Sequence, residues 1–281
     1  MAANTWQRLL DDRGARAAAA VLGAAALAAV LAPWIAPYDP TLQPDPVALR
    51  LVAPTWQHPF GTDPFSRDVL SRVLHGARVS LGVAAGAMLL SVTLGAALGA
   101  LAAVVGGWVD GVVSGLVDVL IAMPRLLVVI ALVATFGALS PWWLVALIGG
   151  SGWLTTARIV RAEFRDHLQR EYVLAARALG ASRRRIIWNH LLPAVAPQLA
   201  VAAALALAAV IPLEAALSFV GLGIQPPLPS WGNILLDGTD YLTSAWWLVV
   251  FPIVAVSLTV GSALVLADRL RVAIAGEERG A

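Results

Sequence analysis

The chain has 281 residues, of which 59% are hydrophobic and 13% charged, and its mean hydropathy is +0.80. Because a soluble domain carries roughly 25% charged residues, this composition indicates a membrane protein. The absence of cysteine excludes disulfides and cysteine-based metal sites. All 19 basic residues are arginine, so the lysine-dependent phosphate loop of ATPases is also excluded, and any ATP must be hydrolysed by a different polypeptide. The arginines cluster beside apolar stretches, which membrane topology explains without nucleic acid.

Residues 1–16 form a polar N-terminal tail, and residues 17–36 are predicted to be the first transmembrane helix. A cleaved signal peptide is the competing interpretation, because alanine-rich sites follow. The apolar stretch is longer than the ~7–15 residues of a signal core, however. Since ~20 residues cross the hydrocarbon, we expect an uncleaved helix whose N-terminus is cytoplasmic.

Residues 37–78 are rich in proline and charge and are predicted to lie outside, as an extended segment followed by an amphipathic helix. Asp63 is expected to cap this helix, with Pro64 at its first position and Gly76 at its end. The helix either lies against the membrane or other helices, or it merely joins two spans, and both possibilities stay open. Four arginines fall on this side and 14 on the side predicted to be cytoplasmic, in agreement with the positive-inside rule.

Three further spans are predicted after this segment. They are residues 79–105, 112–136 and 142–159, joined by an inside turn at 106–110 and an outside turn at 137–141. Glycines at four-residue spacing in span two favour close helix packing over substrate contact. Asp118 and Arg125 fall within span three, where charges are costly and often functional. Since Asp118 lies near the inner end, we favour a position at the interface or a pair with a neighbouring helix. Glycines near residue 150 predict a loosened segment in span four.

Residues 161–193 are predicted to be a cytoplasmic loop, because eight of the 19 arginines lie between Arg158 and Arg185. The loop is expected to hold two short helices. Gly180 can end the first helix in the left-handed conformation, and Ser182 can cap the second. Small residues on the first helix would let a partner's backbone approach closely, as in helix-in-groove recognition.

Span five is predicted at residues 194–219, with Glu214 in its outer part. Glu214 either faces a cavity or pairs with an outer arginine, and the sequence does not decide between these. Residues 218–233 predict an ordered outer loop, span six at 246–267 returns inside, and residues 272–281 form a cytoplasmic tail. The sequence thus predicts an all-α membrane protein with six transmembrane helices and both termini in the cytoplasm. Residues 79–271 would form its five-helix core.

The polar loop resembles the EAA loop of importer-type ABC permeases, which docks into a groove on an ATPase subunit. The order Ala175-Ala176, Gly180 and Leu192-Pro193 carries this resemblance. Leu174 stands where the family often has glutamate, and Leu191 where it often has isoleucine. The docking residues that the resemblance implies are Ala175, Ala176, Arg177, Leu179, Gly180, Ser182, Ile186, His190, Leu192 and Pro193.

Two external stretches resemble signatures of the C-type subunit of oligopeptide, dipeptide and nickel permeases. The first runs from His58 to Leu81, and the second from Ser218 to Asn233, where Val220 replaces a usual leucine. The residues chosen from these signatures are Gly61, Thr62, Asp63, Arg67, Asp68, Arg72, Gly221, Gly223, Gln225, Pro226 and Trp231. The resemblance covers about residues 30–271 and implies the type I permease fold of ABC importers.

By this resemblance, the chain would form half of the translocation pathway of an ATP-driven importer in the bacterial inner membrane. A homologous permease subunit would complete a heterodimer, two ATPase subunits would bind ATP and magnesium, and an external binding protein would deliver the substrate. No cofactor, metal or nucleic acid is expected on this chain, and no residue is expected to be catalytic. The expected substrate is a di- or oligopeptide, and nickel or another small solute is the alternative.

Two other classes of protein fit the sequence less well. An ion-coupled secondary transporter would show internal repeats and midplane ion sites, but no repeat is visible and only Asp118 and Glu214 are membrane carboxylates. A membrane-embedded enzyme would need histidines at metal-ligand spacing, and the four histidines are scattered along the chain.

Overall fold

The computed structural model describes residues 9–136 and 140–278, and side chains as far as residue 275. This part of the chain is helical, with one isolated β-bridge between Thr62 and Asp68 and no strand. The all-α prediction is therefore confirmed. The elements are α2 (Arg13–Ile35), α3 (Val69–Val105), α4 (Gly107–Ile121), α5 (Arg125–Phe136), α6 (Pro141–Gly152), α7 (Leu154–Leu168), α8 (Glu171–Ala178), α9 (Arg183–Ile186), the π-helical turn η1 (Ile187–Leu191), α10 (Leu192–Phe219), α11 (Trp231–Gly238), the 3-10 turn η2 (Thr239–Tyr241) and α12 (Trp247–Glu278).

Six membrane spans are available in the described residues if two bent helix pairs each count as one. Four helical stretches are long and apolar enough by themselves: α2, α3, the continuous stretch α9–η1–α10, and α12. The pairs α4–α5 and α6–α7 meet the same length and composition criteria when taken together. At 1.5 Å per residue, the 37 residues of α3 extend about 55 Å, well beyond a hydrocarbon core of about 30 Å. The helix therefore projects out of the membrane.

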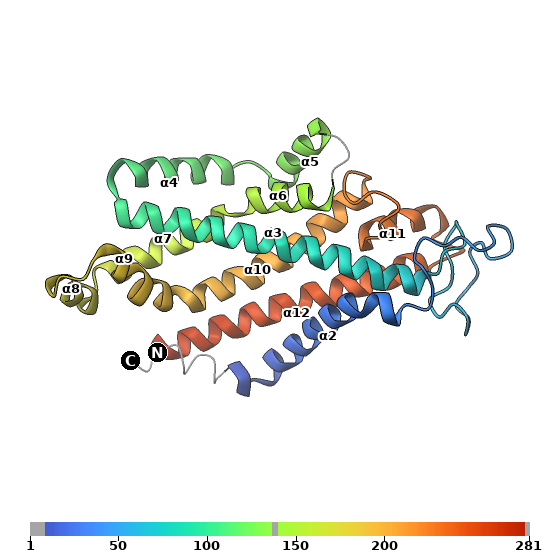
Figure 1. Cartoon of the computed structure of the whole chain (residues 1–281), viewed down its shortest axis with the longest axis horizontal. Coiled ribbons are helices and arrows are strands. Elements are labelled where there is room, and N and C mark those ends of the chain that lie inside the picture. Colours follow the sequence, from blue (N-terminus) through green and yellow to red (C-terminus); the bar gives the residue numbers. More distant parts are fainter. Residues whose placement is uncertain (1–8, 137–139, 279–281) are drawn as a thin grey trace.

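The long helices run side by side along the longest axis of the molecule (Figure 1). The short helices α8 and α9 lie at one end of this axis, left in Figure 1, and the end of α12 points toward the same side. Arg269 of α12 pairs with Asp12 next to α2, at 3.6 Å. The irregular segment before α3 lies at the opposite end, near α11. The predicted docking loop and the predicted external segment thus occupy opposite ends of the bundle.

The prediction of a separate amphipathic helix between Asp63 and Gly76 is wrong. Helix α3 begins at Val69, where Asp68 is the N-cap and its side chain accepts a hydrogen bond from the Ser71 backbone N–H at 2.7 Å. Asp63 cannot cap the helix because its carboxylate holds a tight turn, accepting from the backbone N–H groups of Phe65 and Arg67. Gly76 does not end the helix either. A Cβ there would lie 3.3–3.4 Å from backbone and ring atoms of Ser230 and Trp231, so the glycine permits close packing.

Two spans that the sequence predicts as single helices are bent. Helices α4 and α5 meet at 88° across Ala122–Pro124, and α6 and α7 meet at 44° at Trp153. Pro124 explains the first bend because it cannot donate a backbone hydrogen bond. The glycines at the end of α6 account for the second bend. This bend agrees with the loosened segment predicted in span four. The turn predicted at residues 137–141 falls largely on residues that the structure does not describe.

The helix ends differ from the predicted boundaries at both ends of the docking loop and near the C-terminus. Helix α7 continues to Leu168, so part of the predicted loop is helical. Helix α12 continues to Glu278, which places most of the predicted tail at 272–281 inside a helix. Pro193 lies in the first turn of α10, just before the predicted start of span five. Glycines of α3 pack closely as predicted at Gly99, where a Cβ would lie 2.5 Å from the Ala157 carbonyl oxygen of α7.

Candidate functional site

We call α8, the turn after it, α9 and η1 the elbow (residues 171–191). Helix α8 ends with two hydrogen bonds: the Gly180 N–H donates to the Arg177 carbonyl at 2.9 Å, and the Ala181 N–H donates to the Ala176 carbonyl at 3.0 Å. Gly180 has a φ of +82°, and Ser182 accepts from the Arg185 N–H at the start of α9. These bonds form a Schellman motif followed by an N-cap. The predicted conformations of Gly180 and Ser182 are confirmed.

The two faces of α8 differ in exposure. Val173 is fully buried, and Ala176 is partly buried on the same side. Ala175 is exposed, and Leu179 is 89% exposed, a large apolar side chain that no residue of the described chain covers. Ala175 and Leu179 lie one helical turn apart on this exposed side. These two residues form the ridge that α8 presents outward.

A buried apolar cluster anchors the elbow to the long helices. Ile186 and Leu191 pack in one cluster with Val160 and Phe164 of α7, with Val173 of α8 and with Val195 of α10. Ile186 is 3% exposed, so it holds the elbow in place, and its contact with a partner stays a prediction. Leu192 is only partly buried against the cluster.

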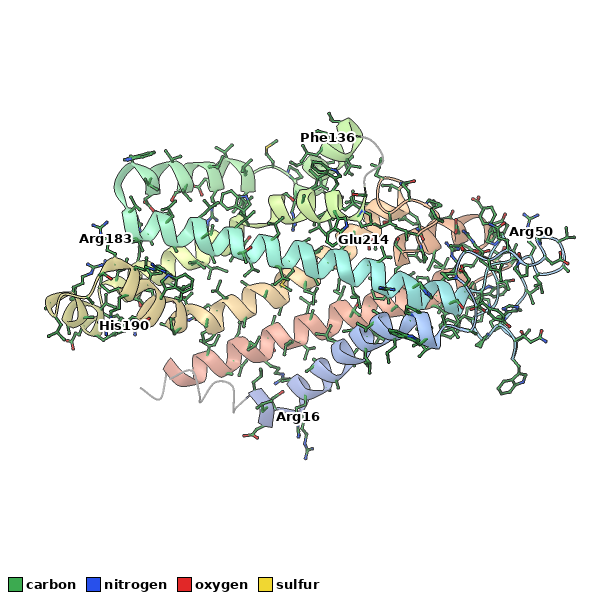
Figure 2. The ribbon with its side chains drawn as sticks, in the orientation of Figure 1. Arg16, Arg50, Phe136, Arg183, His190 and Glu214 are labelled. Carbon is green, nitrogen blue, oxygen red and sulfur yellow. The ribbon has the colours of Figure 1, made fainter. Side chains whose placement is uncertain are left out.

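His190 lies beside the aromatic ring of Tyr172, with ring centroids 6.1 Å apart. The Tyr172 hydroxyl is 2.9 Å from Nδ1 of His167 at the end of α7. Partial burial raises the pKa of Tyr172, and a hydrogen bond from Arg170 to Asp166 raises the pKa of Arg170. Both shifts favour the protonated forms at neutral pH. His190 thus packs against Tyr172 within the elbow, and Figure 2 shows His190 and Arg183 at this end of the molecule.

The arginines of the elbow differ from those of α7. On α7, Arg158 pairs with Asp118, and Arg161 and Arg165 both pair with Asp110. Arg177, Arg183, Arg184 and Arg185 form no ion pair with any side chain in the described residues. A hollow of 320 Å³ beside the elbow is lined by apolar residues and by two of these arginines. It is lined by Val104, Leu168, Arg177, Ala181, Arg183, Ile186, Ile187 and Leu191. The surface offers apolar contact together with unpaired positive charge.

At the opposite end, the first external signature forms a network of ion pairs. Asp63 is fully buried and accepts from Arg67 at 2.6 Å and from Arg72 at 2.5 Å. The same arginines bind Asp237 of α11, at 2.9 and 2.8 Å. Sequence reasoning missed Asp237 because it lies 170 residues from Arg67. No local pattern identifies such a partner.

The remaining residues of this signature fix the start of α3. Asp68 is buried and contacts Nδ1 of His58 at 2.9 Å, in addition to capping the helix. Gly61 has a φ of +73°, and a Cβ there would lie 2.7 Å from the Trp247 indole nitrogen. That nitrogen donates to the Thr62 carbonyl at 3.0 Å. Glycine is required at this position by both its conformation and the close approach.

The second signature packs onto the first. The Trp231 indole N–H donates to the Val73 carbonyl of α3 at 3.2 Å, and the Trp231 backbone N–H donates to the Ser80 hydroxyl. Gly221 has a φ of +76°, and the Gln225 side chain closes the turn by donating to the carbonyls of Gly221 and Gly223. The peptide bond between Pro226 and Pro227 is cis. The two signatures therefore form one continuous structure at this end.

The charged groups that the sequence places inside the spans have separate roles. Glu214 is fully buried and accepts a hydrogen bond from the Ser218 hydroxyl at 2.7 Å, and it forms no ion pair with an arginine that the structure describes. Figure 2 shows it between the two ends of the molecule. Asp118 and Arg158 form a pair whose side chains are 67% and 54% exposed, as favoured for Asp118. Arg125 bonds to α6, through the Ile148 carbonyl and the Ser151 hydroxyl.

Comparison with known proteins identifies the family. Residues 95–275 match the profile of the binding-protein-dependent transport system inner membrane component, and residues 1–54 match the N-terminal TM domain of oligopeptide transport permease C. The chain is 34% identical to the di/tripeptide transport system permease protein DppC of Pseudomonas aeruginosa, covering 96% of this chain and 90% of that protein. It is 38% identical to the dipeptide transport system permease protein DppC of Escherichia coli (96% and 91% covered) and 37% identical to that of Bacillus subtilis (96% and 84% covered). The chain therefore belongs to the family of inner membrane components of binding-protein-dependent transport systems.

Proposed function

We propose that this chain is a permease subunit of an ATP-driven importer and forms half of its translocation pathway. The observation that carries the proposal is the elbow at one end of a bundle of membrane helices. It presents exposed Leu179 and four arginines that pair with no acidic side chain of the described residues. An exposed apolar ridge beside an open hollow is suited to a helix-in-groove contact with another protein. In such an importer, ATP and magnesium are bound by two separate ATPase subunits, and these dock on the elbow.

The remaining partners follow from the family and from the opposite end of the molecule. A homologous permease subunit completes a heterodimer, and an external binding protein delivers the substrate to the end that carries the ion-pair network. The assembly lies in the bacterial inner membrane, with the elbow on the cytoplasmic side. The names of the relatives support a di- or tripeptide as substrate over nickel or another solute.

The elbow is built to pass motion to the spans. Helix α9, the π-helical turn and α10 form one continuous stretch, Arg183–Phe219. The buried cluster ties the same elbow to α7 through Val160 and Phe164. A displacement of the elbow by closing ATPase subunits therefore moves α10 and α7 together, because packed interiors do not deform locally. This movement would switch the pathway between its two accessible states.

Reconstitution tests the proposed function. The complete assembly in vesicles, with its binding protein, should accumulate a labelled dipeptide only when ATP is present on the elbow side. Omitting either the ATPase subunits or the binding protein should reduce uptake to background. Uptake that persists without the ATPase subunits, driven by an ion gradient, would contradict the proposal and favour a secondary transporter.

Cysteine labelling tests the orientation of the chain. The chain has no native cysteine, so in each single-cysteine variant the introduced residue is the only thiol of this chain that can be labelled. In intact cells, Gln225→Cys should react with a membrane-impermeant maleimide, whereas Arg184→Cys should react only after the membrane is opened. The reverse pattern would place the elbow outside and remove it from any cytoplasmic ATPase.

A further inference from the structure

Arg125 places a charge at the middle of the membrane-spanning region. It is the first residue of α5, next to the 88° bend after α4. A Cβ added to Gly152 would meet both the Ser91 hydroxyl and Nη2 of Arg125, so the guanidinium lies level with Ser91. Ser91 is near the centre of the 37-residue helix α3. The guanidinium is therefore far from both ends of the bundle.

The contacts of Arg125 within the chain are with neutral groups. Nη2 donates to the Ile148 carbonyl at 2.7 Å, and Nε donates to the Ser151 hydroxyl at 3.3 Å. Among the side chains that the structure describes, no carboxylate pairs with Arg125. The C-terminal end of α6, to which these acceptors belong, supplies only about half of a negative charge. A neutral amide could satisfy the same acceptors, so their hydrogen bonding does not account for a full positive charge.

Part of the guanidinium remains free. Nη1 donates to no described residue and is not fully buried. Met123 and Leu126 on either side of the arginine are exposed, and space lies open around Gly150. The N-terminus of α5 adds partial positive charge at the same point. The bend thus presents an accessible donor group with a net positive potential.

A full charge facing lipid at this depth costs about 2.5–3.5 kcal/mol or more. We therefore infer that the bend faces the boundary with the second permease subunit, where the pathway runs, and we propose that Arg125 binds the C-terminal carboxylate of the peptide in transit. The inference rests on the proposed peptide-import function. Every linear peptide carries this carboxylate, and arginine binds carboxylates through two parallel hydrogen bonds. Arg125 would then favour peptides over uncharged solutes without selecting for side chains.

The test uses the complete assembly in vesicles and two substrates, a labelled dipeptide and its C-terminal amide. The binding protein has its own preference between them, but that preference is common to all permease variants and cancels in the ratio of the two uptake rates. Arg125→Gln places an amide nitrogen near the position of Nε, where it can donate to Ser151, and removes the charge. It should lower uptake of the free dipeptide about tenfold or more while leaving the amide unchanged. Arg125→Lys keeps the charge but not the two parallel hydrogen bonds, so it should retain part of the preference. Arg158→Gln, which removes an exposed arginine, should leave the ratio unchanged.

A second measurement keeps the test decisive if uptake of the amide is too slow to measure. A photoreactive benzoylphenylalanine at Met123 should crosslink to labelled dipeptide during turnover, and Arg125→Gln should abolish this crosslink. Equal loss of uptake for both substrates, together with loss of the second permease subunit on purification, would overturn the proposal and assign Arg125 to an acidic residue of that subunit. An unchanged uptake ratio or a persistent crosslink in Arg125→Gln would also overturn it. Because binding-protein-dependent uptake by the wild type is measured in the same vesicles, failure of the proposed function itself would be seen separately.

Discussion

Replacing Leu179 with aspartate is expected to release the ATPase subunits from the purified assembly while the permease still inserts into the membrane. Leu179 is 89% exposed at the end of α8 and contributes nothing to the buried cluster that holds the elbow. In a docked complex, an aspartate there would be buried in an apolar groove without a partner, which costs several kcal/mol. A loss of about 3 kcal/mol weakens binding by roughly a hundredfold or more. Co-purification of the ATPase with an affinity-tagged permease measures the effect.

The matched control is Gln169→Asp, which introduces the same charge at an exposed position in the turn between α7 and α8. It should retain the ATPase. Gly180→Trp should release the ATPase for a different reason, because φ at this position is +82° and a bulky side chain disrupts the turn after α8. If Leu179→Asp keeps its ATPase at wild-type levels, the ridge of α8 is not the docking surface.

The elbow could be predicted from the sequence because its structure depends on neighbouring residues. A left-handed glycine and a serine cap act within a few residues of their partners, so Gly180 and Ser182 are recognisable in isolation. The all-α class and the approximate positions of the spans follow from apolar stretches in the same way. What the sequence could not show is which side of α8 faces inward. That depends on Val173 meeting α7 and α10 in the folded protein.

The end opposite the elbow was predicted less well, because its residues have distant partners. Asp63 followed by Pro64 has the local pattern of a helix start, yet its carboxylate is occupied by Arg67 and Arg72. The helix begins five residues later, where Asp68 is free to cap it. The bend at Pro124 could have been anticipated from the proline itself, but not its 88° angle.

Removing the carboxylate of Asp63 is expected to destabilise the external end strongly, whereas removing that of Asp118 should have little effect. In Asp63→Ala, the buried Arg72 loses one of its two acidic partners, and Arg67 loses its closest one. Breaking a buried pair in this way costs about 3–5 kcal/mol, because a charge stays buried without its partner. The turn that precedes α3 also loses the two hydrogen bonds that the backbone N–H groups of Phe65 and Arg67 donate to the Asp63 carboxylate. The thermal midpoint of the purified protein should fall by on the order of 10 °C.

Asp118→Ala is the matched comparison because it removes an aspartate–arginine pair of similar length in which both side chains are more than half exposed. Exposed pairs contribute about 0–1 kcal/mol, so its midpoint should stay within a few degrees of the wild type. Limited proteolysis separates local from global effects: Asp63→Ala should be cut faster between residues 37 and 68 while the elbow keeps its wild-type cleavage pattern. Similar midpoints for the two variants would mean that the buried network does not hold the external segment against α11. The stability of this end would then rest on the tryptophan contacts of Trp231 and Trp247 with α3 and the segment before it.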